Sequence, residues 1–400
     1  SMIWDKIQPS SFELDEEMIE SLFGYKTQSP VKIEETTGKG SSVDKRVLDP
    51  MRLQNITILL KAVNASPQQV CEALITGDGL SPQQLEALVR ISPTMEEEAK
   101  LSRAEESCYE LVPAEKFIKV LLDIPFAFQR VEAMLFRETF EDEVVHLRNS
   151  FSMLEEACKE LRSSRLFLKL LQAVLKTGNR MNNGTIRGGA KAFRLDALLK
   201  LADIRGADGK TTLLHFVVQE IIRSEGIQLS DSKISHKCHG SPQKGNILRT
   251  EEEKEENYKR TGLELVSGLS MEMYNVKRTA TVDMELLASS VSNLAEGIKK
   301  VRGLVNEELV TDDEKERFAA NMTAFLGHAE RALKELREDE RRVCVSLGEV
   351  TEYFHGDNVC KVEEPLRIFV IVRDFLGMLE HVCKEIRSSK LPSGPTPPFR

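Results

Sequence analysis

The sequence lacks the features that would mark a membrane-embedded or a disulfide-stabilised protein. No apolar run approaches the roughly 18 residues that a helix needs to cross a bilayer. The N-terminal residues SMIWDKIQPS do not have the regions of a signal peptide. The seven cysteines are widely spaced, and no two of them form a CxxC pair. This pattern favours reduced thiols in a reducing compartment. We therefore expect a cytoplasmic protein, and membrane anchoring through segments outside this sequence stays open.

Patterns typical of catalysis and of metal binding are also missing. His236, Cys238 and His239 lie close together, but a zinc site needs a fourth ligand and usually a second pair at a set spacing. Two segments resemble phosphate-binding loops. In GADGKTT, Ile204 occupies the position of the required first glycine, and in GTIRGGAK, Ala190 occupies the position of the lysine. We expect no enzymatic activity, no cofactor and no metal.

Glycine and proline are sparse, with 23 and 14 residues, and they lie mostly in connecting segments. Charged residues make up 30% of the chain and hydrophobic residues 41%, which suits helices with a modest core and large solvated faces. The formal net charge of −9 argues against general nucleic-acid binding. Outside one glycine-rich insert, the chain has the pattern of long amphipathic helices.

Several segments predict individual helices. The motifs SPQQV and SPQQL each place serine before proline, as expected for a capped helix start, and SPTMEEEAKL is expected to begin a helix in the same way. Residues 114–176 should form two or three longer helices. A helix that follows Phe216 should end at Gly226 and be followed by a polar loop over residues 227–249. A further helix is expected in PLRIFVIVRDFLGMLEHVCKEI.

A heptad pattern gives the clearest periodicity in the chain. The apolar residues of the first stripe are Met284, Leu287, Val291, Leu294, Ile298, Val301 and Val305. A similar stripe follows in Phe318, Met322, Phe325, Ala329, Leu333 and Leu336. Because heptad stripes of this length are typical of coiled coils, we expect the two helices to form an antiparallel pair.

Two apolar residues lie outside the predicted core. Trp4, the one tryptophan, belongs to an apolar N-terminal segment that is followed by a polar, linker-like stretch over residues 24–46. Tryptophan is a frequent interface anchor, although a lone residue near a terminus can also be inert. Ile58 points away from the face formed by Leu53 and Ile56, as an isolated surface isoleucine or as a plug for a partner's groove.

The segment from Gly178 to Phe216 is the most informative part of the sequence, because it combines glycine- and asparagine-rich turns with a dense set of cations. The cationic set is Lys176, Arg180, Arg187, Lys191, Arg194, Lys200, Arg205 and Lys210. In an acidic chain, these residues form either a solvated basic face or a surface that attracts an acidic protein.

The same segment resembles the signature of the formin homology-2 domain. The family pattern falls on Gly178, Asn179, Asn182, Phe193, Leu195, Lys200, Leu201 and Asp203. IPFAFQRVEAMLF and YFHG are also similar to family segments, and TTLLHFVVQEIIRSEG resembles plant formins in particular. The resemblance covers essentially the whole chain.

The resemblance implies an all-α, elongated, multi-helix fold. Its parts would be a partial lasso at 1–23, a flexible linker at 24–46, a knob at 47–135, and a post with adjoining helices and the GNRMNNG motif at 136–255. A coiled-coil region at 256–347, a C-terminal post helix at 348–390 and a tail at 391–400 would follow.

The resemblance also implies a function: a head-to-tail homodimer that nucleates actin filaments and remains processively at the barbed end. Ile58 matches the knob isoleucine that enters a groove of actin. Arg205 matches an actin-contacting position that is usually lysine, and Lys200 is its neighbour. The alternative is a non-enzymatic coiled-coil scaffold.

Dimerisation would insert Trp4 of one chain into the partner's post, at the turn that contains Gly178, Asn179 and Asn182, with Phe193 following. Family lassos usually carry another tryptophan upstream, and this sequence begins after that point. We therefore expect weakened dimerisation. Profilin would bind only through a proline-rich region outside this sequence, and the segment itself should bind no nucleic acid or membrane.

Overall fold

The computed structural model describes residues 47–103, 111–186, 188–237, 250–308, 315–355 and 366–389. The chain divides into two units after Arg46, and only the second is described here. Within the described residues every regular element is a helix, which confirms the all-α prediction, and the only extended pairing is an isolated antiparallel bridge between Arg205 and Thr212. Trp4 and the predicted lasso and linker lie outside the described residues.

The helices of the first half are α2 (Pro50–Val63), α3 (Pro67–Thr76), α4 (Pro82–Ile91), α5 (Met95–Arg103), α6 (Pro113–Leu122), α7 (Ala127–Ser163) and α8 (Arg165–Met181). The second half contains a 3-10 helix η2 (Leu195–Lys200), then α9 (Leu213–Lys237), α10 (Glu251–Glu272), α11 (Tyr274–Thr279), α12 (Met284–Gly303), a π-helical turn η3 (Leu304–Glu308), α13 (Lys315–His355) and α14 (Arg367–Ser388).

Local capping explains where the short helices begin. Ser66 and Ser81 cap α3 and α4, each in a reciprocal capping box with a glutamine three residues later. The expected start of α5 was wrong by two residues, because the helix begins at Met95 and not at Pro93. Its first turn is closed by Thr94, whose hydroxyl accepts from the Glu97 amide at 3.2 Å while the Glu97 carboxylate accepts from the Thr94 amide at 2.8 Å. Thr94 caps the helix in place of Ser92 because Thr94 and Glu97 together form both bonds of a capping box.

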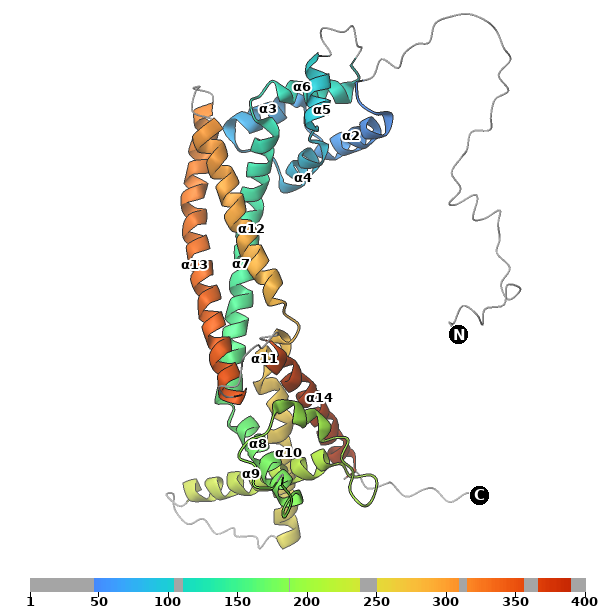
Figure 1. The fold of residues 1–400 in the computed structure, drawn as a ribbon, viewed down its shortest axis with the longest axis vertical. Coiled ribbons are helices and arrows are strands. Elements are labelled where there is room, and N and C mark those ends of the chain that lie inside the picture. The colour runs from blue at the N-terminus through green and yellow to red at the C-terminus, as the bar shows by residue number, and fades with distance from the viewer. Residues whose placement is uncertain are drawn as a thin grey trace, which may run out of the picture. The chain divides into compact units, whose positions relative to one another are not determined.

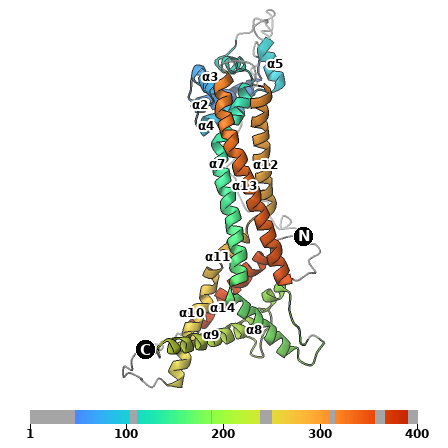
Figure 2. The same ribbon diagram turned by 90° about the vertical axis from the view of Figure 1, so that its left-hand side faces the viewer.

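Three long helices, α7, α12 and α13, lie side by side (Figures 1 and 2). The two predicted heptad stripes are buried almost throughout; Met284, Val305 and Phe325 are only partly covered. The Arg302–Glu330 ion pair joins α12 to α13 in the expected antiparallel sense. Sequence periodicity did not identify α7 as the third helix of this bundle.

α7 and α13 run parallel and are joined by four polar side-chain pairs spaced by one heptad along both helices, three of which are Arg–Glu ion pairs. The pairs are Glu141–His328, Arg148–Glu335, Glu155–Arg342 and Arg162–Glu349. The acid lies on α7 in the first and third pairs and on α13 in the second and fourth. Beneath the first pair, the rings of Phe140 and Phe325 pack edge to face with centroids 5.3 Å apart.

The N-terminal helices are tied to the start of α7 through the last carbonyls of α3. Arg130, which is buried, donates from Nη1 to the Leu74 carbonyl at 3.0 Å, and its guanidinium lies 4.9 Å from the centre of the Phe318 ring. Burial lowers the pKa of Arg130. Arg137 donates to the Gly77 carbonyl at 2.8 Å. Cationic side chains on C-terminal carbonyls are favourable, and these bonds fix α3 on the bundle.

A second tie fixes the helices at the other end of α7. The Glu160 carboxylate accepts from the backbone amides of Asn275 and Val276 at 2.9 and 3.1 Å, so it caps the N-terminus of α11. Arg130 and Glu160 are about 30 residues apart on one helix, or about 45 Å at 1.5 Å per residue. The helix α7 therefore sets the distance between the two ends.

The expectation that a helix ends at Gly226 was wrong: α9 continues to Lys237. Gly226 is buried where α10 crosses α9, and a Cβ there would lie 2.0 Å from the Tyr258 carbonyl oxygen. Gly262 on α10 makes the reciprocal approach, with a Cβ position 1.8 Å from the Ile222 carbonyl oxygen. These glycines allow close packing of two helix backbones, which explains why a glycine that looked like a helix end lies within a helix.

Candidate functional site

The first candidate surface is the outer face of α2. Asp49 caps this helix, and Leu53, Ile56 and Val63 form its buried face. Ile58 lies on the opposite side with 57% of its surface exposed. Because the buried face packs on α4 and α6, Ile58 is held on a fixed helix and not on a loop.

A second apolar residue on this face was not identified from the sequence. Met51 is 76% exposed and lies one heptad before Ile58, so both side chains project from one side of α2. Asn55 and Ala62 are exposed at the intervening and following helical positions. The pattern was recognisable in principle from the spacing of Met51 and Ile58, but the polar residues between them concealed it.

The second candidate surface is the turn that ends α8. The Asn179 side chain closes this turn: its Nδ2 donates to the Ala190 carbonyl and its Oδ1 accepts from the Ala190 amide, both at 2.8 Å. The Asn182 carbonyl accepts from the Thr185 amide at 3.0 Å and from its hydroxyl at 2.8 Å. A side chain at Gly188 would collide with this carbonyl, at 2.7 Å. Asparagine and glycine are therefore needed here to build the turn itself.

The structure gives different roles to the predicted dimerisation residues. Asn179 uses its amide within the turn, whereas the Asn182 side chain has no hydrogen-bond partner within the described residues. A Cβ at Gly178 would meet no atom within 4 Å, so the surface above this residue is open. Phe193 is half-buried and packs against the core. Gly178 and Asn182 thus offer open, hydrogen-bonding surface, while Asn179 and Phe193 support it.

The third candidate surface is the loop after η2. Arg205 bridges to Thr212, and the Gly206 amide donates to the Thr211 carbonyl at 2.8 Å, which makes a tight hairpin. The Asp208 carboxylate accepts from the amides of Lys210 and Thr211 at 3.0 Å. Hydrogen bonds from the Thr211 side chain and from these amides lower the pKa of Asp208. The hairpin holds an exposed Arg205, whose Nη1 donates to the Gly209 carbonyl at 3.2 Å.

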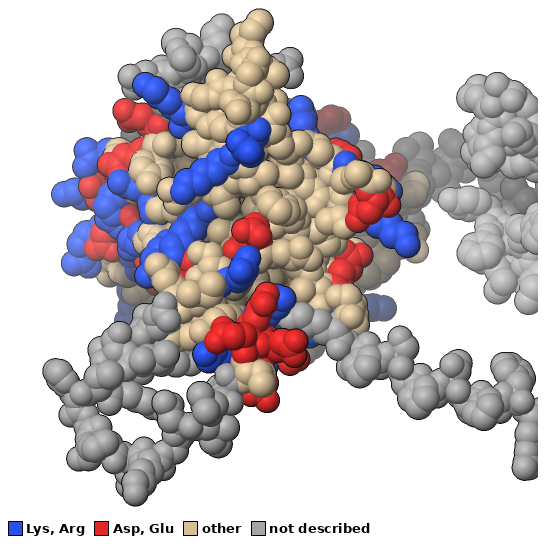
Figure 3. Space-filling view, turned by 90° about the horizontal axis from the view of Figure 1, so that it is seen from below, with Lys and Arg blue, Asp and Glu red and all other residues tan. Residues whose placement is uncertain are grey.

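Lys200 ends η2, which is anchored by the buried Leu195 and Leu198. Lys200 and Arg205 are both exposed, and neither forms an ion pair within the described residues. Figure 3 views this end of the molecule and shows Lys and Arg most numerous on one side, beside a broad uncharged area. Arg187 lies outside the described residues.

Other candidate residues do not form a reactive site. Cys238 and His239 lie outside the described residues, and the part of the chain that is described contains no cluster of His, Cys, Asp or Glu suited to a metal. His215 is half-buried, with Nε2 2.7 Å from Glu385 and Nδ1 2.8 Å from the Thr212 hydroxyl. No helix among the described residues is long and apolar enough to cross a membrane.

The fold and these surfaces define a helical protein-interaction domain with an exposed apolar face at one end of a three-helix bundle and a basic, turn-rich surface at the other. The chain belongs to the formin homology-2 family: the Formin Homology 2 Domain profile matches residues 1–380. This is a non-enzymatic, actin-binding family, so the expectation of no enzyme is confirmed.

The similar proteins are plant formin-like proteins. The chain is 62% identical over 402 residues to Formin-like protein 11 of Arabidopsis thaliana, with 100% of this chain and 45% of the relative covered. It is 52% identical over 396 residues to Formin-like protein 2 of Oryza sativa subsp. indica, with 99% and 44% covered. These relatives confirm the predicted resemblance to plant formins. The chain spans somewhat under half the length of the relatives it matches.

Proposed function

We propose that this chain binds actin, nucleates actin filaments and remains at the barbed end as a head-to-tail dimer. The observation that carries the proposal is the exposure of Ile58 on a helix whose opposite face is fully packed. A rigidly held isoleucine that is more than half exposed is suited to insertion in a partner's groove.

The arrangement of charge supports a second actin contact. Lys200 and Arg205 are exposed on the anchored η2 helix and on a tight hairpin, with no acid of the described chain neutralising them. The ties at Arg130 and Glu160 hold the two surfaces at a set separation. A bundle that presents two fixed contacts can orient actin subunits, which is what nucleation requires.

The dimer would form through Trp4 of one chain and the α8 turn of the other. The open surface above Gly178 supports this role, as does the Asn182 side-chain amide, which has no hydrogen-bond partner within the described residues, because tryptophan needs both apolar contact and an acceptor for its indole N–H. Asn179 and Phe193 would support the turn. From membership of the family we also propose the domain boundaries at residues 47–135, 136–255, 256–347 and 348–390. The same membership is the basis for proposing a cytoplasmic location and association with the actin cytoskeleton.

Pyrene-actin assembly tests the actin contact. We expect Ile58→Ala to lower the initial assembly rate by at least about tenfold, because burying an isoleucine side chain contributes about 1.5–3 kcal/mol. Leu286→Ala is the matched control, since Leu286 is an exposed aliphatic residue on another helix, α12. Equal loss in both variants, or no loss in either, would exclude a specific role for Ile58.

Trp4 offers a direct test of the dimer, because it is the one tryptophan in the chain. We expect its fluorescence to shift to shorter wavelength as concentration rises, in parallel with a sedimentation change from monomer to dimer. Trp4→Ala should remain monomeric to higher concentration with unchanged helical content. A dimer of the same affinity in this variant would contradict the proposed lasso contact.

The scaffold alternative receives less support. The heptad stripe of α12, which would have to recruit another coiled coil, is buried against α13 and α7 in the same chain. Assembly rates that are the same with and without the dimeric protein would nevertheless favour the scaffold over the actin nucleator.

A further inference from the structure

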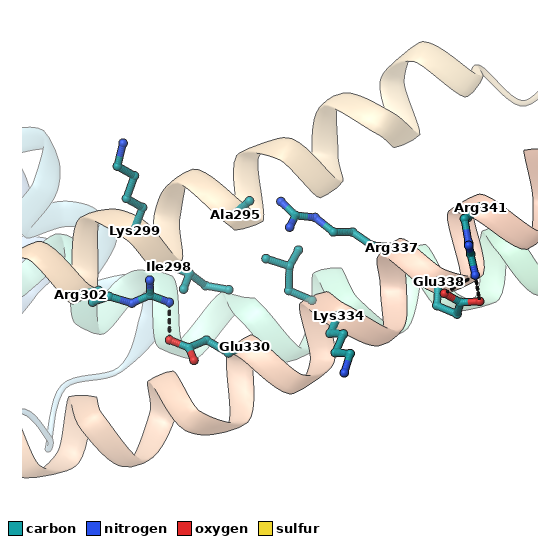
Figure 4. A pocket seen from close by; sticks show the side chains of 10 residues that line it. Ala295, Ile298, Lys299, Arg302, Glu330, Lys334, Arg337, Glu338 and Arg341 are labelled. Carbon is teal, nitrogen blue, oxygen red and sulfur yellow. Dashed lines mark hydrogen bonds and ion pairs between the residues drawn. The ribbon is translucent and has the colours of Figure 1, made fainter.

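A groove of about 690 Å³ lies between α12 and α13, away from the residues assigned to actin and to the dimer. Its floor is apolar: Ala295 is partly exposed there, and the buried Ile298 and Leu333 lie beneath it. Figure 4 shows charged side chains of both helices around this floor, with Arg337 reaching from α13 towards Ala295.

The walls of the groove are strongly basic. Their cations are Lys299, Arg302, Lys334, Arg337 and Arg341, against the two acids Glu330 and Glu338. This excess of positive charge contrasts with the net charge of −9 for the chain. A local field of this sign attracts acidic partners even to an acidic protein.

The acids of the groove do not neutralise all of its cations. Glu330 pairs with Arg302, and Glu338 pairs with Arg341 at 2.7 Å. The remaining three cations, Lys299, Lys334 and Arg337, are exposed and have no ion-pair or hydrogen-bond partner among the described residues. Their side chains are therefore available to another molecule.

We propose that this groove binds an acidic amphipathic helix of a partner protein. An apolar stripe on such a helix would cover Ala295, while acids on its flanks would pair with Lys299 on α12 and with Lys334 and Arg337 on α13. Apolar contact flanked by opposite charges is the usual arrangement for a helix in a groove and for helices in coiled coils. A small phosphate ligand would use the cations but would leave Ala295 uncovered.

This site is independent of the proposed actin contacts, because Ile58, Lys200, Arg205 and the α8 turn do not line it. The groove is already formed on the side of the three-helix bundle, so a further helix can bind there without rearrangement of α7, α12 and α13. The partner would be recruited along the side of the domain and would leave its two ends accessible.

Fluorescence anisotropy tests the proposal with a defined probe. The probe is a fluorescein-labelled helical peptide of about three heptads, with leucine along one stripe and glutamate on both flanks. We expect micromolar binding that weakens as salt rises. A peptide with lysine in place of glutamate should not bind, and one with serine in place of leucine should bind at least about tenfold more weakly. Absence of binding by the acidic amphipathic peptide would overturn the proposal.

Variants locate the binding site. Lys334→Glu/Arg337→Glu should weaken the peptide by at least about tenfold, because two attractive contacts become repulsive. Arg317→Glu is the control: Arg317 is an exposed cation near the start of the same helix and does not line the groove. Equal weakening in the control would show non-specific attraction and overturn the site.

Ala295→Trp separates a seated helix from simple anion binding, since it fills the floor of the groove without changing charge. Loss of peptide binding with normal helical content and normal actin assembly supports the proposal. If Ala295→Trp binds the peptide as the wild type does, or if inositol hexakisphosphate displaces the leucine and serine peptides equally, the groove is an anion site and the proposal is wrong.

Discussion

Arg162 on α7 and Glu349 on α13 form an ion pair in which Nη1 lies 2.5 Å from Oε2, and this pair is the last of four that are spaced by one heptad. Neighbouring pairs have opposite polarity. A slip of one heptad between the helices would therefore bring like charges together at the matched positions. The four pairs therefore favour one register of the parallel helices, as charges beside a coiled-coil interface usually do.

A charge-swap experiment tests this register. Glu349→Arg should lower the free energy of unfolding by about 1 kcal/mol at most, because both side chains are half-exposed and solvent screens the repulsion. The double variant Arg162→Glu/Glu349→Arg should recover the loss. The control combines Glu349→Arg with Lys159→Glu, which affects only a pair within α7, and should show no such recovery. Urea unfolding at low and high salt measures the wild type, the single variants and both double variants. Additive losses for Arg162→Glu and Glu349→Arg would contradict the proposed register.

The glycines between α9 and α10 lead to a second prediction. Gly262→Ala should lower the free energy of unfolding by about 3 kcal/mol or more, because the added Cβ would lie 1.8 Å from the Ile222 carbonyl oxygen and the helices would have to separate. Gly268→Ala on the same helix is the matched control. A Cβ at Gly268 meets nothing within 4 Å, so this change should be neutral or stabilising by up to about 1 kcal/mol. Equal midpoints of thermal unfolding for the two variants would disprove close packing at Gly262.

The sequence predicted features that depend on local pattern. The heptad stripes predicted buried residues on α12 and α13, and the serine–proline motifs predicted the starts of α3 and α4, because periodicity and capping are read within one helix. The end of α9 at Lys237 was not predicted. A glycine such as Gly226 is favoured both where a helix ends and where two helices cross closely. Only the position of α10 distinguishes the two.

The candidate site shows the same limit. The exposure of Ile58 followed from helical spacing, whereas the role of Asn179 depends on a bond to Ala190 eleven residues later. Periodicity also gave no sign that α7 is the third helix, because its apolar residues serve both the N-terminal helices and the bundle. Contacts between distant segments set these features, and a single sequence contains little direct information about them.

Met51 provides a third prediction, which rests on the proposed actin contact of Ile58. Because both residues project from one side of α2, Met51→Ala should lower the initial rate of actin assembly by about threefold to tenfold. Met95→Ala is the control, since Met95 is 89% exposed on a different helix, α5. Neither change should alter thermal stability. An assembly rate for Met51→Ala equal to that of the control would restrict the contact to Ile58.

The hairpin around Asp208 allows the effect of loop geometry on actin assembly to be distinguished from the effect of charge. Its carboxylate holds the amides of Lys210 and Thr211 and so supports the loop that carries Arg205. The folded pKa of Asp208 is lowered from 3.8 by the Thr211 hydroxyl and these amides. The bonds therefore stabilise the loop at pH values above 3.8, and this contribution is lost as the pH falls through the lowered value.

Asp208→Ala should accordingly slow actin assembly at neutral pH, because Arg205 loses its fixed position. A purely electrostatic account predicts the opposite, since removal of an acid makes this surface more positive and should favour an acidic partner. Amide hydrogen exchange of Thr211 should increase in the same variant. Faster assembly by Asp208→Ala with unchanged exchange would contradict a positioning role for Asp208.

Arg205→Lys is the companion variant. It retains the charge but loses the bond to the Gly209 carbonyl. A small effect of this change on the assembly rate would mean that charge matters more than loop geometry.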